Sequence, residues 1–189
     1  MKVLLLNGSP RKNGCTYTAL NVVADALKAE GIDAEVFQAG DPDMENVKAA
    51  AAKLKDSDAL VVGSPVYWAS PSGQIIEFMD RLASVAGKDM LYKPAAAVAS
   101  ARRAGTTATL DVLTKYFSYH QMPVVSSCYW NMVHGNAPEE VMRDEEGVQI
   151  MRILGKNMAW LLKCIEAGKK NGVAVPAAED KIKTNLSGN

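Results

Sequence analysis

Residues 8–16 read Gly8-Ser9-Pro10-Arg11-Lys12-Asn13-Gly14-Cys15-Thr16, and they lie between an apolar run at residues 2–6 and a helical pattern. A second stretch, Gly63-Ser64-Pro65-Val66-Tyr67-Trp68, occupies the same position after the apolar residues 59–62. In an open parallel α/β sheet, ligands bind beyond the carboxyl ends of the strands, where helix N-termini offer free N–H groups to anions. Both stretches therefore predict an α/β fold with a binding site at this edge of the sheet.

Apolar runs and helical patterns alternate along the rest of the chain. Strands are predicted at residues 2–6, 34–37, 59–62, 95–99 and 122–125. Helices are predicted at about residues 16–30, 45–55, 105–117 and 145–168, and one more begins at Pro71 with Ser70 as its N-cap. The alanine-rich strand at 95–99 has poor strand propensity, and it is predicted mainly because the alternation requires it.

This order of elements also predicts the topology of the sheet. A helix after every strand requires right-handed crossovers and hence parallel strands. The expected fold is a three-layer α/β sandwich with a five-stranded parallel sheet of order 2-1-3-4-5. Its switch point lies between strands one and three, so it brings the two quoted stretches together. One domain is predicted over residues 1–171, followed by an extended tail at 172–189.

The composition excludes several classes of protein. Acidic and basic residues number 21 each, so no net charge favours nucleic acid or an anionic membrane surface. No apolar run approaches the ~20 residues that span a bilayer. The first apolar run ends at Asn7, too early for a signal peptide. We therefore predict a cytoplasmic protein that binds small molecules and neither nucleic acid nor a membrane.

The three cysteines, Cys15, Cys128 and Cys164, lie far apart and form no C-x-x-C pair. They indicate a reducing compartment, and they predict neither a disulfide framework nor a metal site. Cys15 opens a helix, where a thiol can become a nucleophile. A phosphatase loop of the form C-x5-R would need arginine at position 21, which is Asn21. Cys15 is therefore interpreted as a small residue that lines the loop.

The first loop has the composition of a phosphate cradle. Gly8 and Gly14 permit tight turns, while hydroxyl, amide and guanidinium groups can donate to phosphate oxygens. The Walker A and G-x-G-x-x-G patterns are missing, which favours a terminal monophosphate over a dinucleotide. An ordinary capped strand-to-helix turn is the alternative. The residues predicted to bind the phosphate are Ser9, Arg11, Asn13, Gly14, Cys15 and Thr16.

The second loop places apolar and aromatic side chains beyond the end of the third strand. Pro65 stiffens the turn, and Val66, Tyr67 and Trp68 offer a surface for a planar ring. The alternative is that this pair of aromatic residues forms core or dimer contacts. A monophosphate site beside an aromatic platform indicates FMN as the cofactor.

A third loop, residues 100–107, ends the fourth strand and reaches the far edge of the ring. Ser100, Arg102, Gly105 and Thr106 are predicted to bind the cofactor there. If Arg102 or Arg103 points inward, its charge stabilises the reduced, anionic flavin. The alternative is that both arginines are solvated or contact a partner subunit.

Two further groups of residues have competing interpretations. Tyr129, Trp130 and His134 lie in an aromatic segment after the fifth predicted strand, and with Tyr67 and Trp68 they are candidates to shape an acceptor pocket. A buried dimer contact explains that segment equally well. His120 ends a helical pattern and is interpreted as a charge at a helix C-terminus.

The motif G-S-P-R-x-x-G-x-T at residues 8–16, the motif G-S-P-V-Y-W at 63–68, and Gly73 with residues 80–82 resemble the NADPH-dependent FMN reductase family. The resemblance extends from the first strand to about Gly168. It implies a flavodoxin-like fold, tightly bound FMN, and a homodimer or homotetramer in which a neighbouring subunit covers the flavin. The chain departs from the family at Cys15, where asparagine is frequent, and at Arg102 and Arg103, which replace a glycine-rich sequence.

The chain is also similar to the iron-sulfur flavoprotein branch of this family. That branch carries a cysteine cluster between strands two and three, and residues 39–58 contain no cysteine. We therefore expect no iron-sulfur cluster and no metal.

The expected function is an NAD(P)H-dependent oxidoreductase that passes electrons through FMN to a small acceptor such as a quinone, flavin, metal or nitro or azo compound. The cofactor carries the chemistry, so no catalytic side chain is predicted. The alternative is a flavodoxin-like electron carrier, which normally shows a T-x-T-x-x-T loop and acidic surroundings. A response-regulator-like switch would need an aspartate where Gly63 and Ser64 stand.

Overall fold

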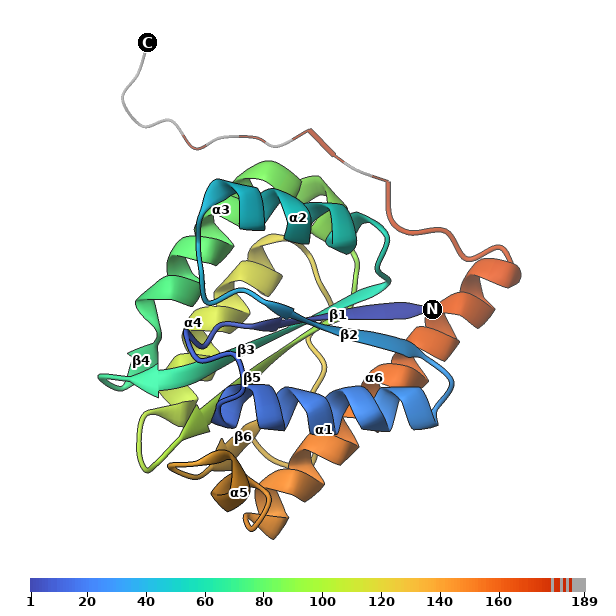
Figure 1. Cartoon of the computed structure of the whole chain (residues 1–189). Helices are drawn as coiled ribbons and strands as arrows, with labels where there is room; N and C mark the ends of the chain where they lie inside the picture. Colours follow the sequence, from blue (N-terminus) through green and yellow to red (C-terminus); the bar gives the residue numbers. More distant parts are fainter. Residues whose placement is uncertain (178, 181, 183, 185–189) are drawn as a thin grey trace.

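The computed structural model describes residues 1–177, 179, 180, 182 and 184, and in this part of the chain it shows a parallel sheet between two layers of helices (Figure 1). The strands pair in the order β2-β1-β3-β5-β6. Their bounds are Lys2–Asn7 for β1, Asp33–Gln38 for β2, Ala59–Tyr67 for β3, Ala95–Ala101 for β5 and Met132–His134 for β6. A short strand, β4 (Ser70–Pro71), pairs antiparallel with β3. The predicted α/β fold and the order 2-1-3-4-5 of its parallel strands are confirmed.

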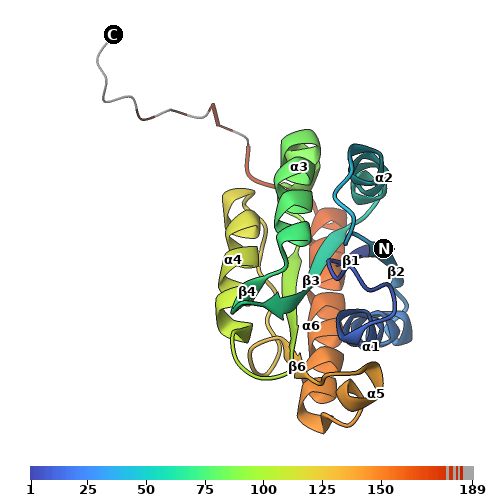
Figure 2. The same cartoon turned by 60° about the vertical axis from the view of Figure 1, so that its left-hand side comes forward.

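Alternate residues of β1 face opposite layers. Leu4 and Leu6 pack in one core with the helices α2 (Met44–Lys55), α3 (Gly73–Met90) and α4 (Thr106–Tyr119). Val3 and Leu5 pack on the other face with α1 (Cys15–Ala29) and α6 (Glu145–Lys170), and Figure 2 shows these layers on either side of the sheet. A short helix, α5 (Pro138–Val141), was not expected from the sequence. Burial on both faces explains why low-propensity β5 is nonetheless a strand.

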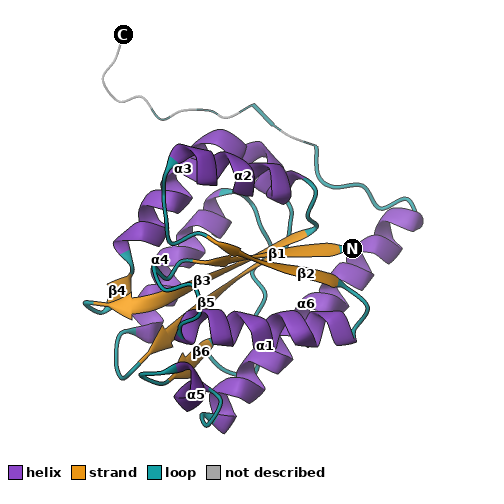
Figure 3. Cartoon of the chain, in the orientation of Figure 1, coloured by secondary structure: helices purple, strands orange, loops and turns teal. Residues whose placement is uncertain are grey.

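The second motif extends a strand instead of ending it. β3 continues from Ala59 to Tyr67, and the chain turns back at Trp68 and Ala69 to form β4 (Figure 3). Both turn residues have positive φ, 53° and 57°, as in the two-residue turns whose twist matches that of paired strands. The predicted helix start at Ser70 and Pro71 is therefore wrong. α3 begins at Gly73, and Ser72 is its N-cap, accepting a hydrogen bond from the Ile75 N–H.

The fifth parallel strand also lies later than predicted. Of residues 122–125, Val124 forms one isolated bridge with Ala95, after which the chain leaves the sheet. It rejoins β5 at Met132–His134, within the aromatic segment that was expected to follow the fifth strand. The detour is held by Ser127, whose hydroxyl oxygen lies 2.8 Å from both the Tyr129 carbonyl oxygen and the Asn131 side-chain oxygen and shares its one proton between them. The strand was predicted at the apolar residues 122–125. The sequence did not show that the chain would leave the sheet at residues 126–131 and pair with β5 only afterwards.

Two remaining predictions concern the chain as a whole. None of the described helices is long and apolar enough to cross a bilayer. α6 ends at Lys170, just before the predicted tail. Within that tail, residues 178, 181, 183 and 185–189 lie outside the described residues.

Candidate functional site

A cavity of about 230 Å³ lies at the carboxyl edge of the sheet, where the three predicted loops meet. Most of the residues predicted to bind the cofactor line it, and they are Ser9, Arg11, Gly14, Cys15, Thr16, Pro65, Val66, Tyr67, Ser100 and Arg102. Four predicted residues, Asn13, Trp68, Gly105 and Thr106, do not line it. The geometry brings the three loops together, and cofactor binding by these residues stays a prediction.

The four other residues have clear positions. Asn13 lies exposed in the first loop, and Trp68 is 100% exposed at the tip of the β3–β4 hairpin. Gly105 precedes α4 with φ +99°, and a Cβ atom there would lie 2.6 Å from the Ala69 Cα and 2.8 Å from Val66. Gly105 therefore allows α4 to begin directly against the hairpin, and Thr106 is buried behind it.

Two side chains that were not predicted as site residues, buried Asn7 and half-buried Gln38, hold the first loop. The Asn7 side chain donates to the Lys12 carbonyl at 3.2 Å and to the Gln38 side chain at 2.7 Å. Gln38 in turn donates to the Ser9 carbonyl at 2.6 Å. The Ser9 hydroxyl accepts from the Arg11 N–H at 3.1 Å. The loop is thus fixed from β1 and β2 before any ligand binds.

Hydroxyl groups connect the loops to one another. Thr16 and Ser100 share a buried hydrogen bond of 2.7 Å between their side-chain oxygens, which joins the first loop to the third. The Ser72 hydroxyl donates to the Gly8 carbonyl at 2.8 Å, and the Ser72 N–H donates to the Ser64 hydroxyl at 3.0 Å. These bonds join the first loop to the hairpin. The serine residues in these loops indicate that such hydrogen bonds can form. The partners of each hydroxyl cannot be predicted from the sequence, because they depend on the tertiary fold.

The helices that begin at the site lack side-chain caps. Asp43, Ser72 and Asp144 cap α2, α3 and α6 by accepting N–H groups of the first turn. α1 and α4 start instead at Gly14 and Gly105, with no side-chain cap and no acidic residue in the first turn. Uncapped N–H groups and the positive end of the helix dipole favour an anion. The start of α1, which lines the cavity, is therefore suited to bind an anion there, whereas the start of α4 lies against the hairpin.

Positive side chains add to this potential. Arg11 and Arg102 both line the cavity and are exposed. Among the described residues, neither forms an ion pair with a carboxylate, whereas Arg81 and Arg143 each pair with a glutamate. A guanidinium without a carboxylate partner remains available to a phosphate. The cavity combines donors and positive charge, which suits a phosphorylated ligand.

The hairpin forms the aromatic wall. Tyr67 is 40% exposed, and Trp68 projects completely into solvent. A non-glycine residue with positive φ costs roughly 1–2 kcal/mol, and the turn contains two in succession. The turn places Trp68 at the tip of the hairpin, in solvent and not in the core. The hairpin therefore offers apolar surface that the protein's own core does not use.

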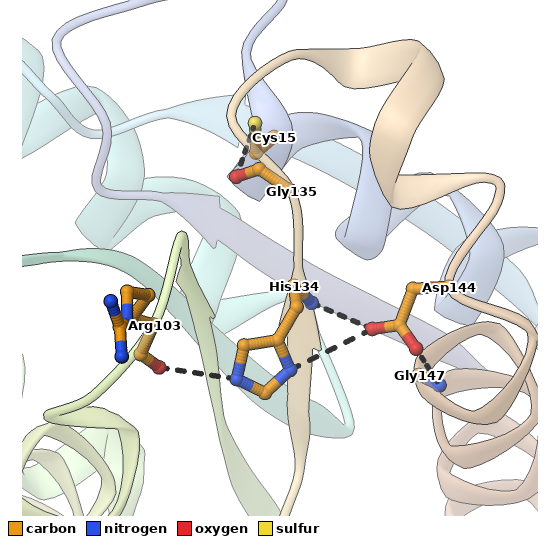
Figure 4. Close-up of polar contacts among 6 residues, drawn as sticks. All are labelled: Cys15, Arg103, His134, Gly135, Asp144 and Gly147. Atoms are coloured by element: carbon orange, nitrogen blue, oxygen red, sulfur yellow. Dashed lines mark hydrogen bonds and ion pairs between the residues drawn. The ribbon is translucent and has the colours of Figure 1, made fainter.

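A fourth wall was missed by the sequence analysis. Gly135 and Asn136 follow β6 and line the cavity, and Figure 4 shows the Cys15 thiol donating to the Gly135 carbonyl at 3.6 Å. The Asn136 N–H donates to the Glu140 carboxylate at 2.7 Å, so α5 holds this wall. Placing the fifth strand at Met132–His134 would have predicted it, because the carboxyl ends of parallel strands meet at one edge.

A larger groove of about 700 Å³ lies between α3 and α4. Its lining includes Asp80, Tyr116 and His120, and Tyr116 donates to Asp80 at 2.5 Å. Burial, with Asp80 next, raises the pKa of the Tyr116 hydroxyl, so it stays protonated. None of the loops after the parallel strands contributes to this groove. We therefore assign the candidate site to the smaller cavity.

The Cys15 thiol lies half-buried at the start of α1. Burial raises the pKa of Cys15 more than the nearby Arg11 lowers it. At neutral pH the thiol is therefore protonated, which agrees with a loop-lining role and not with that of a nucleophile.

We expect iodoacetamide at pH 8 to label exposed Cys128 and Cys164 before Cys15, because the thiolate is the reactive form and Cys15 forms little of it. Labelling of Cys15 should accelerate at higher pH and slow down when FMN is added. Peptide mass spectrometry after timed quenching measures the three rates. Preferential labelling of Cys15 at pH 7 would contradict the raised pKa.

Comparisons with known proteins bear on the family and the fold of the chain. A family model described as NADPH-dependent FMN reductase matches residues 1–137. An iron-sulfur flavoprotein of Methanocaldococcus jannaschii is 29% identical over 192 residues, with 88% of this chain and 100% of the relative covered. An NADPH azoreductase of a Bacillus species is 30% identical over 108 residues, with 53% and 59% covered.

A solved structure shows the same fold. The flavoenzyme NAD(P)H:(acceptor) oxidoreductase FerB of Paracoccus denitrificans superposes with a TM-score of 0.70 at 17% identity, over 86% of this chain and 97% of that one.

Proposed function

Because the chain belongs to the NADPH-dependent FMN reductase family, we propose that it passes electrons from a nicotinamide through FMN to a small acceptor. Its cofactor is FMN, and it is an NAD(P)H-dependent flavin oxidoreductase. The resemblance seen in the two motifs is thereby confirmed. When bound in the cavity, FMN would supply the chemistry of hydride uptake and electron transfer, and the residues that line the cavity would hold and orient it.

The residues present fit this cofactor. The observation that carries the proposal is the uncapped start of α1, which lines the cavity together with Arg11 and Arg102, two arginines without a carboxylate partner among the described residues. In the proposed arrangement, Ser9, Arg11 and Thr16 bind the phosphate with the N–H groups that begin α1. Val66 and Tyr67 would contact the ring, and Arg102 would approach it from the third loop. These side chains orient the cofactor, and none has to transfer a proton.

The acceptor is proposed to be an organic compound such as a quinone, a free flavin, or a nitro or azo compound. One relative is an azoreductase, and several others are iron-sulfur flavoproteins. This chain has three cysteines, in α1, in the 126–131 detour and in α6. A cubane cluster is held by four thiolates, so one chain cannot supply them. We therefore propose that it works with FMN alone.

A second subunit is proposed to complete the site. The cavity of about 230 Å³ is smaller than the roughly 300–1,000 Å³ of pockets that enclose a ligand. The exposed Tyr67 and Trp68 stand beside it, and a neighbouring copy would cover both side chains and the outer part of the ring. Sedimentation velocity of the FMN-loaded protein tests this, and a monomer at micromolar concentration would reject it.

Anaerobic reduction separates the enzyme from the alternative, an electron carrier without its own NAD(P)H activity. The purified protein should show flavin absorbance, or gain it on incubation with FMN. Mixing with NADPH or NADH should then bleach the absorbance near 450 nm within seconds, an order-of-magnitude expectation from ordinary turnover rates. A protein that takes up no flavin would reject the site. Flavin that neither nucleotide bleaches would favour the carrier.

A further inference from the structure

His134, at the end of β6, stands between two other segments of the chain. Its Nε2 atom lies 3.2 Å from the Arg103 main-chain carbonyl oxygen, and its Nδ1 atom lies 3.8 Å from an Asp144 carboxylate oxygen (Figure 4). A carbonyl oxygen only accepts hydrogen bonds, so Nε2 carries a proton in this contact. The imidazole therefore holds the Arg103 main chain as a donor.

Asp144 fixes the main chain at His134. One of its oxygens accepts the His134 N–H at 2.6 Å, and the other accepts the Gly147 N–H at 3.0 Å as the N-cap of α6. A Cβ atom at Gly147 would lie 2.3 Å from this carboxylate, so the approach is close. The main chain that carries the imidazole is thus anchored to α6.

The segment that His134 holds has few other restraints. Residues 102–104 form the turn between β5 and α4, and all three are exposed. Among the described residues, no other hydrogen bond to the main chain of 102–104 is present besides that from His134. Arg102 belongs to this turn and lines the cavity. The position of Arg102 therefore depends on the hydrogen bond that the neighbouring residue, Arg103, accepts from His134.

We propose that His134 is a positioning residue: by donating to the Arg103 carbonyl, it holds residues 102–104 so that the Arg102 guanidinium stays at the flavin site. This inference rests on the proposed function for its chemical consequence, but the hydrogen-bonded clamp itself does not. A fixed positive charge beside the ring stabilises the reduced, anionic cofactor more than a mobile one does, because no reorganisation is needed. His134 thereby acts on the flavin through Arg102 without touching it.

A different use of the same residues fails on geometry. Cys15, His134 and Asp144 have the side-chain types of a nucleophilic triad, and they lie near one another in Figure 4. The Cys15 thiol, however, bonds to the Gly135 carbonyl and not to the imidazole. The pKa of this thiol is also raised by burial, which opposes nucleophilic activation.

Two conservative variants separate the two sides of the imidazole. In His134→Gln the amide nitrogen replaces Nε2 and keeps a donor toward Arg103, whereas in His134→Asn it replaces Nδ1 and loses that donor. His134→Ala removes both. The clamp predicts that glutamine retains wild-type behaviour and that asparagine behaves like alanine. If the alanine variant does not fold, the glutamine and asparagine pair still decides the matter.

Limited proteolysis of the FMN-free protein tests directly whether the hydrogen bond from His134 to the Arg103 carbonyl holds residues 102–104. Trypsin cleaves after arginine, and its rate at the Arg103–Ala104 bond follows the population of the open turn. Loss of the hydrogen bond should raise that rate about three- to tenfold in the Asn and Ala variants, and the Gln variant should cleave like wild type. Equal rates in all four proteins would overturn the clamp.

The midpoint potential of the bound FMN tests whether the position of Arg102 affects the stability of the reduced cofactor. If the Asn variant weakens binding of the reduced form about tenfold relative to the oxidised form, its two-electron potential falls by about 30 mV. The Gln variant should keep the wild-type potential. Faster proteolysis with an unchanged potential would overturn the role of Arg102. A wild-type protein without flavin would reject the proposed function, while the proteolysis still decides the clamp.

Discussion

Replacing Gly40 with alanine is expected to lower both the stability of the protein and its affinity for FMN, although Gly40 does not line the cavity. A Cβ atom at this position would lie 2.0 Å from the Ser9 carbonyl oxygen and 2.5 Å from the Ser9 carbonyl carbon. It would also lie 2.7 Å from the Gln38 amide nitrogen that holds Ser9. Because these obstacles are mainly backbone, the phosphate loop itself has to move.

The expected cost of Gly40→Ala is about 1–3 kcal/mol in the free energy of unfolding, the range for an overpacked site. Displacement of Ser9 should also weaken FMN binding by at least about tenfold, since misplaced donors no longer match the phosphate. Urea unfolding of the FMN-free protein measures the first effect, and quenching of flavin fluorescence measures the second.

Gly73→Ala is the matched control for this variant. Gly73 is the first residue of α3, and a Cβ atom there would meet nothing within 4 Å. Alanine should leave the FMN affinity unchanged and raise the stability by up to about 1 kcal/mol. A Gly40→Ala protein with the dissociation constant of the wild type would show that the loop tolerates the shift and that its position is not critical.

The layers of this fold followed from the sequence because each strand is a short apolar run buried on both faces. Residues 59–62 are an example, with every side chain from Ala59 to Val62 fully buried. The alanine-rich β5 was predicted from the alternation alone, and its pairing with β3 from Leu60 to Pro65 confirms it. Burial between helices matters more for this strand than intrinsic propensity does.

The errors arose where local signals compete with tertiary pairing. Ser70 and Pro71 have the types expected at the start of a helix, but the turn at Trp68 directs them back along β3 instead. Likewise, Val124 and Val125 are apolar, yet Met132–His134 forms the longer pairing with β5. Neither choice can be read from a single window of sequence, because the pairing partner decides it.

The candidate site shows the same division. The loops after strands one, three and four were found because the carboxyl ends of parallel strands share one edge of the sheet. The residues that brace those loops, Asn7 and Gln38, were missed because their partners are main-chain carbonyls on another element. Gly135 and Asn136 were missed with the strand that precedes them. The loops that line the site can be predicted from the order of the strands. The residues that support those loops cannot, because their partners are known only once the chain is packed.

Replacing Arg11 with alanine is the most direct test of the phosphate site. Arg11 lines the cavity, is exposed, and has no carboxylate partner among the described residues, so its loss should disturb little else. A hydrogen bond to a charged group contributes about 1.5–3 kcal/mol to binding. The dissociation constant of FMN should therefore rise about 10- to 150-fold. Arg11→Lys should retain part of the affinity, because lysine keeps the charge but not the bidentate geometry.

Riboflavin, which has the ring but no phosphate, distinguishes a phosphate contact from a general disturbance. If Arg11 binds the phosphate, Arg11→Ala should weaken FMN binding and leave riboflavin binding unchanged. Arg152→Ala is the matched control, since Arg152 is exposed on α6 and does not line the cavity. Titrations followed by flavin fluorescence give the dissociation constants of FMN and of riboflavin for the wild type and both variants. Equal losses for FMN and riboflavin would mean that Arg11 supports the loop or the ring, and that the uncapped start of α1 binds the phosphate without it.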